Sequence, residues 1–184
     1  MQEILNRLQQ ALIEKRMPIV GYLNPGLPKQ EIVQYFTELN LQINEEVVSL
    51  FNWRNGIQWE NIPTGKLIFG PRGVYFPLQE SINIYKRESP KKYPNYFFPI
   101  FSDASYLICL DRNVDSWGMV FKYSLQMNKG KPMSCFDSIP AMISTITECF
   151  LQNAYFIDDG MFDYDPEMER NIALQYNPKS VFWK

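Results

Sequence analysis

The stretch LFNWRNG, residues 50–56, divides this 184-residue chain into a helical first part and a strand-rich second part. Apolar residues recur at helical spacing before it, and Asn44 is well placed to cap the helix that they form. Gly56 fits the left-handed position that commonly follows a helix, because glycine has no Cβ to cause strain there. We therefore expect Asn55 and Gly56 to end a helix and to have structural roles.

Two more helices are expected on the N-terminal side of this stretch. Residues 1–16 show an apolar stripe at helical spacing, with charged residues on the other faces. Residues 17–28 contain three prolines and two glycines, a composition typical of a connector. Pro28 suits a first helical turn, where no backbone N–H is needed, so the next helix is expected to begin there and Pro28 to be structural.

The C-terminal side carries short β-rich runs separated by turn residues. The expected strands are 66–69, 73–76, 97–101, 106–110 and 119–123, joined as an antiparallel meander. Helical spacing predicts a short helix at 78–88, and good caps at Ser138 and Asp165 predict two more helices, the last ending near Tyr176. The expected fold class is α+β, with N-terminal helices, a central, mostly antiparallel sheet of about five or six strands, and C-terminal helices packed on it.

The composition argues against catalysis. The chain has no histidine, which removes Ser-His-Asp and Cys-His mechanisms together with the commonest zinc ligand. It has no glycine-rich phosphate-binding motif, and its three cysteines form no Cys-x-x-Cys pair. One enzymatic alternative is a pair of carboxylates, such as Asp103 and Asp111, acting as the acid and base of a hydrolase. We expect no enzymatic activity, no cofactor and no bound metal.

Charge and hydropathy restrict the partners and the compartment. The formal net charge is −2, and no long basic run offers the electrostatic footprint of a nucleic-acid-binding protein. No segment approaches the roughly 20 apolar residues of a membrane span, and the charged N-terminus does not match a secretory signal. Dispersed cysteines favour a reducing compartment. We expect a soluble, cytoplasmic protein that contacts neither nucleic acid nor membrane directly.

The segment 158–169 holds six acids and no base, with four Met, Phe and Tyr side chains between them. Calcium does not fit, because the glycine is not at the sixth position of an EF-hand loop and Pro166 interrupts the loop. Two interpretations remain, a solvated loop that begins a helix and a surface that contacts a partner protein. A Trp-Arg pair at 53–54 is a second candidate, with burial of the tryptophan as its alternative. The candidate partner-binding residues are Asp158, Asp159, Phe162, Asp163, Tyr164, Asp165, Glu167, Glu169, Trp53 and Arg54.

Three groups of motifs follow one another along the chain. Leu27-Pro28 opens one helix, and the stretch 50–56 closes the next. FPIF at 98–101 then leads into YLICLD at 106–111. Last, a strand near 120–123 is followed by CFDS at 135–138, which opens a long helix.

In this order the motifs resemble the SUKH superfamily, the Smi/Knr-type domains that include many bacterial immunity proteins. The resemblance covers residues 27–154, and it departs from the family pattern at Ile57 and at 104–105, where many members have glycine. It implies one SUKH-like domain over residues 1–184, with 155–184 as a helical C-terminal extension.

The resemblance implies an immunity protein that binds a cognate secreted toxin domain of the polymorphic type and neutralises it by occlusion. An acidic surface would suit a basic nuclease as the toxin. A regulatory protein-interaction module of the same superfamily, with no toxin involved, is the alternative. The carboxylate-dependent hydrolase is the more remote one.

Overall fold

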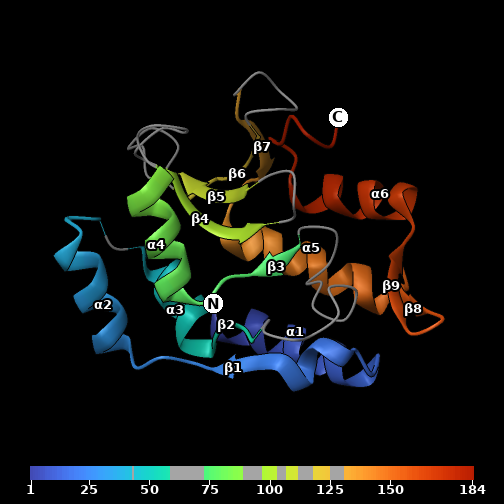
Figure 1. Ribbon diagram of the computed structural model, residues 1–184. Helices are drawn as coiled ribbons and strands as arrows, with labels where there is room; N and C mark the ends of the chain where they lie inside the picture. The colour runs from blue at the N-terminus through green and yellow to red at the C-terminus, as the bar shows by residue number, and fades with distance from the viewer. Residues whose placement is uncertain (43, 59–72, 89–96, 103–106, 112–117, 125–130) are drawn as a thin grey trace.

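The computed structural model describes residues 1–42, 44–58, 73–88, 97–102, 107–111, 118–124 and 131–184 (Figure 1). Within them the chain folds into helices and antiparallel strands, so the α+β class is confirmed. The helices are α1 (Gln2–Glu14), α2 (Lys29–Glu38), α3 (Glu45–Trp53), α4 (Leu78–Glu88), α5 (Ile139–Leu151) and α6 (Pro166–Tyr176), with a 3-10 turn, η1, at Pro18–Tyr22.

The strands are divided among three sheets in the described part of the chain. The largest contains β3 (Val74–Tyr75), β4 (Phe97–Ser102), β5 (Leu107–Asp111), β6 (Val120–Tyr123) and β7 (Met133–Phe136), in that order. Each of these strands is antiparallel to its neighbour, as a meander requires. Two separate pairs are β1 (Leu23–Pro25) with β2 (Arg54–Ile57), and β8 (Tyr155–Asp158) with β9 (Met161–Tyr164). The expected strand at 66–69 lies outside the described residues.

The capping side chains expected from the sequence are confirmed. Asn44 Oδ1 accepts hydrogen bonds from the backbone N–H of Glu46, at 2.7 Å, and of Val47, at 3.2 Å. Ser138 Oγ accepts from the N–H of Ala141 at 3.1 Å and so caps α5. Each cap satisfies backbone donors that have no partner inside their own helix, which fixes where the helix begins.

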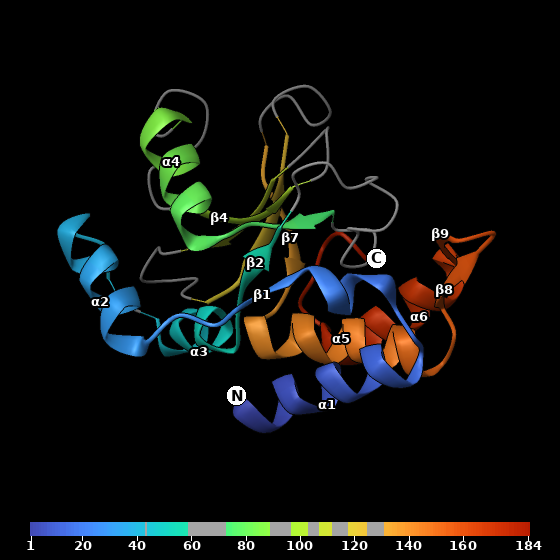
Figure 2. The same cartoon turned by 60° about the horizontal axis from the view of Figure 1, so that its bottom comes forward.

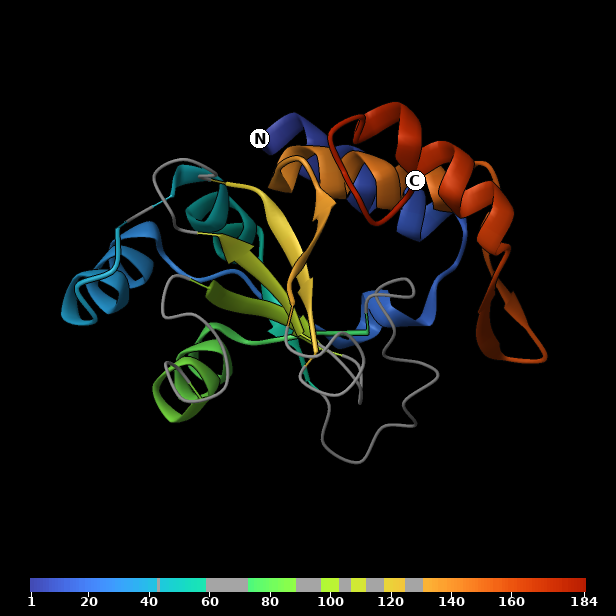
Figure 3. The ribbon, with the colours of Figure 1, turned by 90° about the horizontal axis from the view of Figure 1, so that it is seen from above.

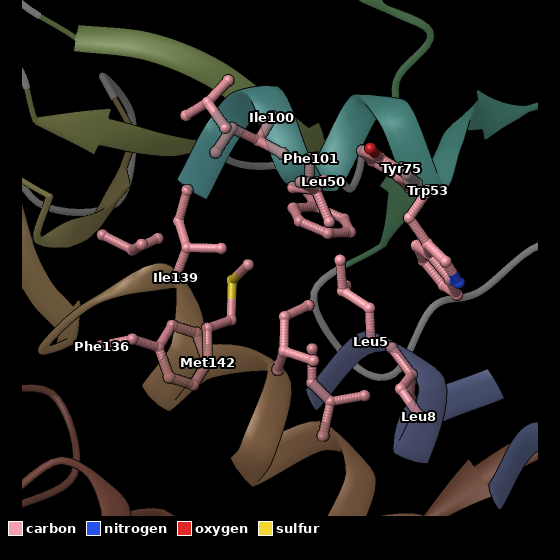
Figure 4. Packing of buried hydrophobic residues seen from close by; sticks show 14 of the residues in the cluster. Leu5, Leu8, Leu50, Trp53, Tyr75, Ile100, Phe101, Phe136, Ile139 and Met142 are labelled. Atoms are coloured by element: carbon pink, nitrogen blue, oxygen red, sulfur yellow. The ribbon is translucent and has the colours of Figure 1, made fainter. Parts of the chain in front are cut away.

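One cluster of buried apolar residues joins the helices to the sheet. Helix α5 packs against α1 on one side and α6 on another, and its apolar stripe is buried between them. Figure 4 shows Leu5 and Leu8 of α1, Leu50 of α3 and Met142 of α5 pointing into this cluster below Phe101 of β4. Full burial of one such side chain stabilises the fold by about 1.5–3 kcal/mol, so this cluster holds the layers together.

The C-terminal residues after α6 run along the outer edge of the five-stranded sheet. The backbone N–H groups of Val181 and Phe182 donate to the carbonyl oxygen of Ser134 in β7, at 3.2 and 3.1 Å. The indole Nε1 of Trp183 donates to the Cys135 carbonyl at 2.6 Å, and the indole is buried. The tail therefore covers an edge that would otherwise present unpaired backbone groups.

The CFDS motif opens a long helix as expected, since Ser138 caps α5, and its Cys135 and Phe136 also belong to β7. Two expectations were wrong. The extension 155–184 is not wholly helical, because residues 155–164 form the β8–β9 hairpin. Helix α3 ends at Trp53, and Arg54 is already extended with φ −147°, so Gly56 is not the residue that terminates the helix. Gly56 does have the expected positive φ, 69°, but within β2.

Candidate partner-binding surface

The β8–β9 hairpin projects from one end of the helical layer, beyond α5 and α6 (Figures 1 and 3). Its strands pair from Tyr155 opposite Tyr164 to Asp158 opposite Met161. The two-residue loop is Asp159-Gly160, with φ values of 46° and 75°. Positive φ at both loop positions is what a type I′ turn requires, and this turn matches the twist of a two-stranded hairpin.

One face of the hairpin packs against the body of the protein. Tyr155 is buried, and its ring contacts Phe150 of α5 at 5.2 Å and Phe162 at 5.5 Å between centroids. Ile157 and Phe162 are half-buried against the same cluster. The Tyr155 hydroxyl donates a hydrogen bond to the carboxylate of Glu169 in α6. These contacts hold the base of the hairpin firmly to the two C-terminal helices.

The opposite face of the hairpin is solvent-exposed and alternates apolar and acidic side chains. Phe156 is 37% exposed and Met161 is 50% exposed, and Asp158 and Asp163 lie beside them. Seven large apolar side chains are exposed in the described part of the chain. Four of the seven lie between residues 156 and 168, so exposed apolar area gathers on this hairpin and the start of α6. They are Phe156, Met161, Tyr164 and Met168.

The acidic candidates divide into three groups in the structure. Asp158, Asp159, Asp163 and Glu167 are exposed, as a partner-facing role requires. Asp165 caps α6 by accepting from the N–H groups of Glu167 and Met168, at 2.9 and 3.0 Å, so its role as a helix start is confirmed.

Glu169 is the acidic candidate that the structure contradicts. It is only 3% exposed, and its carboxylate accepts the hydrogen bond from Tyr155. Its assignment to a partner-binding surface was wrong, because α6 turns this position toward the hairpin base.

The aromatic candidates are also placed differently from one another. Phe162 faces the core side of the hairpin, whereas Tyr164 is exposed at the edge of the molecule and stacks on Phe162 at 6.4 Å. Phe156 was missed by the sequence reasoning. The signal that could have found it is Asp159-Gly160 between two runs of β-forming residues, a strong hairpin signature.

The Trp-Arg pair is placed inside the fold. Trp53 is 9% exposed and belongs to the core cluster, so its assignment as a partner-binding residue was wrong. The Arg54 guanidinium is half-buried, lies 5.9 Å from the centre of the Trp53 ring, and donates to Gln9 Oε1 at 3.1 Å. Contacts within the chain therefore account for Arg54.

Residues 24–27, 52–57 and 75–78 meet in a polar junction. Asn52 Nδ2 donates to the Leu27 carbonyl at 2.7 Å, and Asn55 Oδ1 accepts from the Leu78 N–H at 2.8 Å, which caps α4 from a neighbouring strand. The Tyr75 hydroxyl donates to the Arg54 carbonyl at 2.8 Å. Complete burial raises the pKa of Tyr75 well above its ordinary value. Asn55 therefore has a structural role, as does Pro28, which directly precedes α2.

The described residues hold no group of three or more Cys, Asp and Glu side chains arranged to bind a metal. Of the proposed hydrolase pair, Asp103 lies outside the described residues, and Asp111 is described only as the end of β5. The pKa of Glu46 is raised above its ordinary value, because the effect of burial is larger than the opposing effect of a hydrogen bond from the Ile139 backbone. Glu46 thus links the start of α3 to that of α5, a structural contact.

Among the described residues, none of the helices has the length and apolar character needed to span a bilayer. Comparison with known proteins found no matching family model and no matching curated sequence.

Proposed function

We propose that this protein is a protein-binding module that neutralises a secreted toxin domain by covering its working surface. The observation that carries the proposal is the hairpin face on which exposed apolar side chains alternate with acids. The toxin as partner comes from the resemblance to the SUKH superfamily, and the exposed hairpin face is the surface that we propose for its binding.

Exposed apolar side chains in one place favour an interface. A Phe and a Met that stand in water gain free energy when a partner covers them, by about 25 cal/mol for each Å² of apolar area removed from water. Aromatic residues and Met are enriched in interface cores, and the energetically dominant residues are usually a few anchors within a polar rim. Phe156 and Met161 have the character of anchors, with Asp158 and Asp163 as the rim.

The charge of this region indicates what the partner surface carries. Residues 155–169 contain six acids and no Lys or Arg. The next basic residue, Arg170, donates to the backbone carbonyls of Trp183 and Lys184, at 2.8 and 2.7 Å, and so is held by the C-terminal tail. A basic partner would gain both complementarity and a faster association rate. A nuclease toxin, whose surface must attract phosphate, is the partner class that fits this charge.

The test begins at the neighbouring gene: a toxin-like product encoded there is the partner to purify, and its absence would favour the regulatory module. We expect the purified pair to form a complex and the toxin to lose its activity at one equivalent of this protein. Changing Asp158, Asp159 and Asp163 together to Lys should slow association at least tenfold at low salt, because those charges steer the encounter. Binding without loss of toxin activity would instead indicate a regulatory module, and absence of any complex would contradict the proposal.

A matched control separates the effect of charge on the hairpin from the effect of the net charge of the whole protein. Glu3, Glu38 and Glu45 are also exposed. They lie in the first turn of α1, the last turn of α2 and the first turn of α3, at the end of the molecule away from the β8–β9 hairpin (Figure 2). Changing these three to Lys alters the net charge by the same amount. We expect this variant to associate at close to the wild-type rate. Equal slowing by both variants would show that net charge alone sets the rate.

A further inference from the structure

We infer that the outward face of the β8–β9 hairpin is the docking site, and that it takes a basic, extended protein segment with lysine or arginine at alternate positions. Two such side chains would pair with Asp158 and Asp163, and their aliphatic stems would cover Phe156 and Met161, which lie on either side of the line between the two acids. The identity of the partner rests on the proposed function, whereas the chemistry of the segment follows from the hairpin itself.

The strand register arranges the four side chains as a square of alternating character. Phe156 lies opposite Asp163, and Asp158 lies opposite Met161. Directly opposed Cβ atoms in an antiparallel pair are about 5 Å apart, and alternate residues of one strand are about 7 Å apart. The two acids therefore occupy one diagonal and the two apolar residues the other. Diagonal neighbours are about 7–8 Å apart, and bases at positions i and i+2 of an extended segment, about 7 Å apart, reach both acids because their side chains are long and flexible.

The free edges of the hairpin offer a partner fewer binding groups than this face does. In β9 the Tyr164 N–H already donates to Asp163 Oδ1 at 2.8 Å, which occupies one of the few outward-pointing backbone groups. In β8 the edge begins at Tyr155, which is buried against α5. Each edge thus presents the backbone of about one residue, Phe162 or Ile157, and strand addition normally uses several successive hydrogen bonds. Docking on the face is favoured over pairing at an edge.

A second copy of this chain does not fit the same face. A symmetric dimer places the same patch on both sides of the interface, so the acids of both copies would be buried together with no base from this face to pair with them. Like charges directly opposed across strands are destabilising. A segment of the opposite charge lacks this penalty, and this is why the occupant is expected to be basic.

The experiment uses the full chain, labelled with ¹⁵N, and two synthetic peptides. The probe is acetyl-Lys-Ser-Lys-Ser-Leu-Ser-Leu-amide, which presents two Lys and two Leu on one face when extended. The control peptide has Glu in place of both Lys. We expect the probe to shift the amide signals of Phe156, Asp158, Met161 and Asp163, and the control peptide to leave them unchanged. Shifts that spread over the other exposed acids, or no shifts at millimolar probe, would overturn the inference.

Variants test the apolar diagonal. Changing Phe156 and Met161 together to Ala should weaken probe binding about tenfold or more, as loss of two anchors predicts. The matched control changes Ile13 and Val33 to Ala, two exposed apolar residues on α1 and α2, and should bind like wild type. Both variants alter exposed side chains, so their melting temperatures should match wild type. Equal affinities of the two folded variants for the probe would show that Phe156 and Met161 do not contribute to the binding site.

The same Phe156 and Met161 variant distinguishes this inference from the proposed function. If wild-type protein neutralises the toxin and the variant does so equally well, the docking site is wrong and the function stands. If the probe binds the hairpin face and no toxin is neutralised, the function is wrong and the docking chemistry stands.

Discussion

Gly56 and Gly160 share a backbone conformation and differ in everything around it. Their φ values are 69° and 75°, and each is preceded by an amide or carboxylate residue, Asn55 or Asp159. An ideal Cβ built on Gly56 would lie 2.2 Å from the backbone nitrogen of Pro77, whereas a Cβ on Gly160 would meet nothing within 4 Å. One glycine allows two backbone segments to touch, and the other only allows a turn in open solvent.

The polar junction around Gly56 and the β8–β9 hairpin around Gly160 also differ in what their polar side chains contact. In the junction, the amides of Asn52 and Asn55 bond to backbone groups of other segments, so these polar residues hold the fold together. On the hairpin, Asp158 and Asp159 are exposed and no such bond ties them to another segment in the described residues. Both regions are polar and glycine-containing in sequence. Only the surroundings show that the first is structural and the second is available to a partner.

The first prediction tests the packing at Gly56. Changing Gly56 to Ala should lower the free energy of unfolding by roughly 3 kcal/mol or more, because strain in the left-handed region, about 1–2 kcal/mol, adds to a clash with the backbone of Phe76 and Pro77. Urea denaturation at a fixed m-value measures the change. A loss near 1 kcal/mol would show that the two segments separate easily and that the junction is not tightly packed.

Gly160 provides the matched control for that measurement. Changing it to Ala imposes the same backbone strain in open space, so we expect a loss of only about 1 kcal/mol. The difference between the two alanine variants isolates the close approach from the conformation. Equal losses would mean that conformation alone matters at both sites, and the contrast between the regions would fail.

Local signals in the sequence were enough to predict much of the fold. The caps at Asn44, Ser138 and Asp165 were identified because a short polar side chain followed by an apolar stripe gives a helix start that depends on neighbouring residues only. The antiparallel order of β3 to β6 followed from β-rich runs separated by turns. Both inferences need only a few adjacent residues.

Other features depend on contacts between distant residues. Gly56 was expected to end a helix, but its neighbour is Pro77, twenty-one positions away in the sequence, and local pattern does not reveal that approach. Glu169 was counted among the exposed acids, although α6 turns it toward Tyr155. The hairpin is the exception, because its Asp-Gly turn was visible in the sequence and was interpreted as part of a helix-start loop. For that reason Phe156 was not among the candidates.

A smaller effect is expected at Asn55, which caps α4 from the junction. Changing it to Ala removes the acceptor of the Leu78 N–H and should lower the free energy of unfolding by about 1–2 kcal/mol. Asn55→Asp keeps an acceptor in the same place, next to a helix N-terminus that favours negative charge, and should stay close to wild type. If both variants lose the same free energy in urea denaturation, packing rather than the hydrogen bond explains the role of Asn55.

The smallest effect is expected at Tyr75. The pH dependence of stability at this junction residue should differ from that at Tyr164 of the hairpin. Changing Tyr75 to Phe removes the hydrogen bond to the Arg54 carbonyl and should lower the free energy of unfolding by about 1 kcal/mol at pH 7. Burial holds the pKa of Tyr75 well above 10.0 in the folded protein. The contribution of the neutral phenol is therefore fully present below about pH 10 and is lost as pH rises from there toward the folded pKa, because only the unfolded chain releases the proton.

It follows that the difference between wild type and Tyr75→Phe should shrink, and then reverse, as the pH of urea denaturation is raised from 9 through 10 and above. For one group the wild-type loss approaches about 1.4 kcal/mol for each pH unit in that range. Tyr164→Phe removes an exposed phenol from the hairpin, so its stability should follow that of wild type across the same range. A constant difference between wild type and Tyr75→Phe at every pH would mean that water reaches the Tyr75 hydroxyl. The junction would then be as open to solvent as the hairpin, and the contrast between the two regions would reduce to the packing at Gly56.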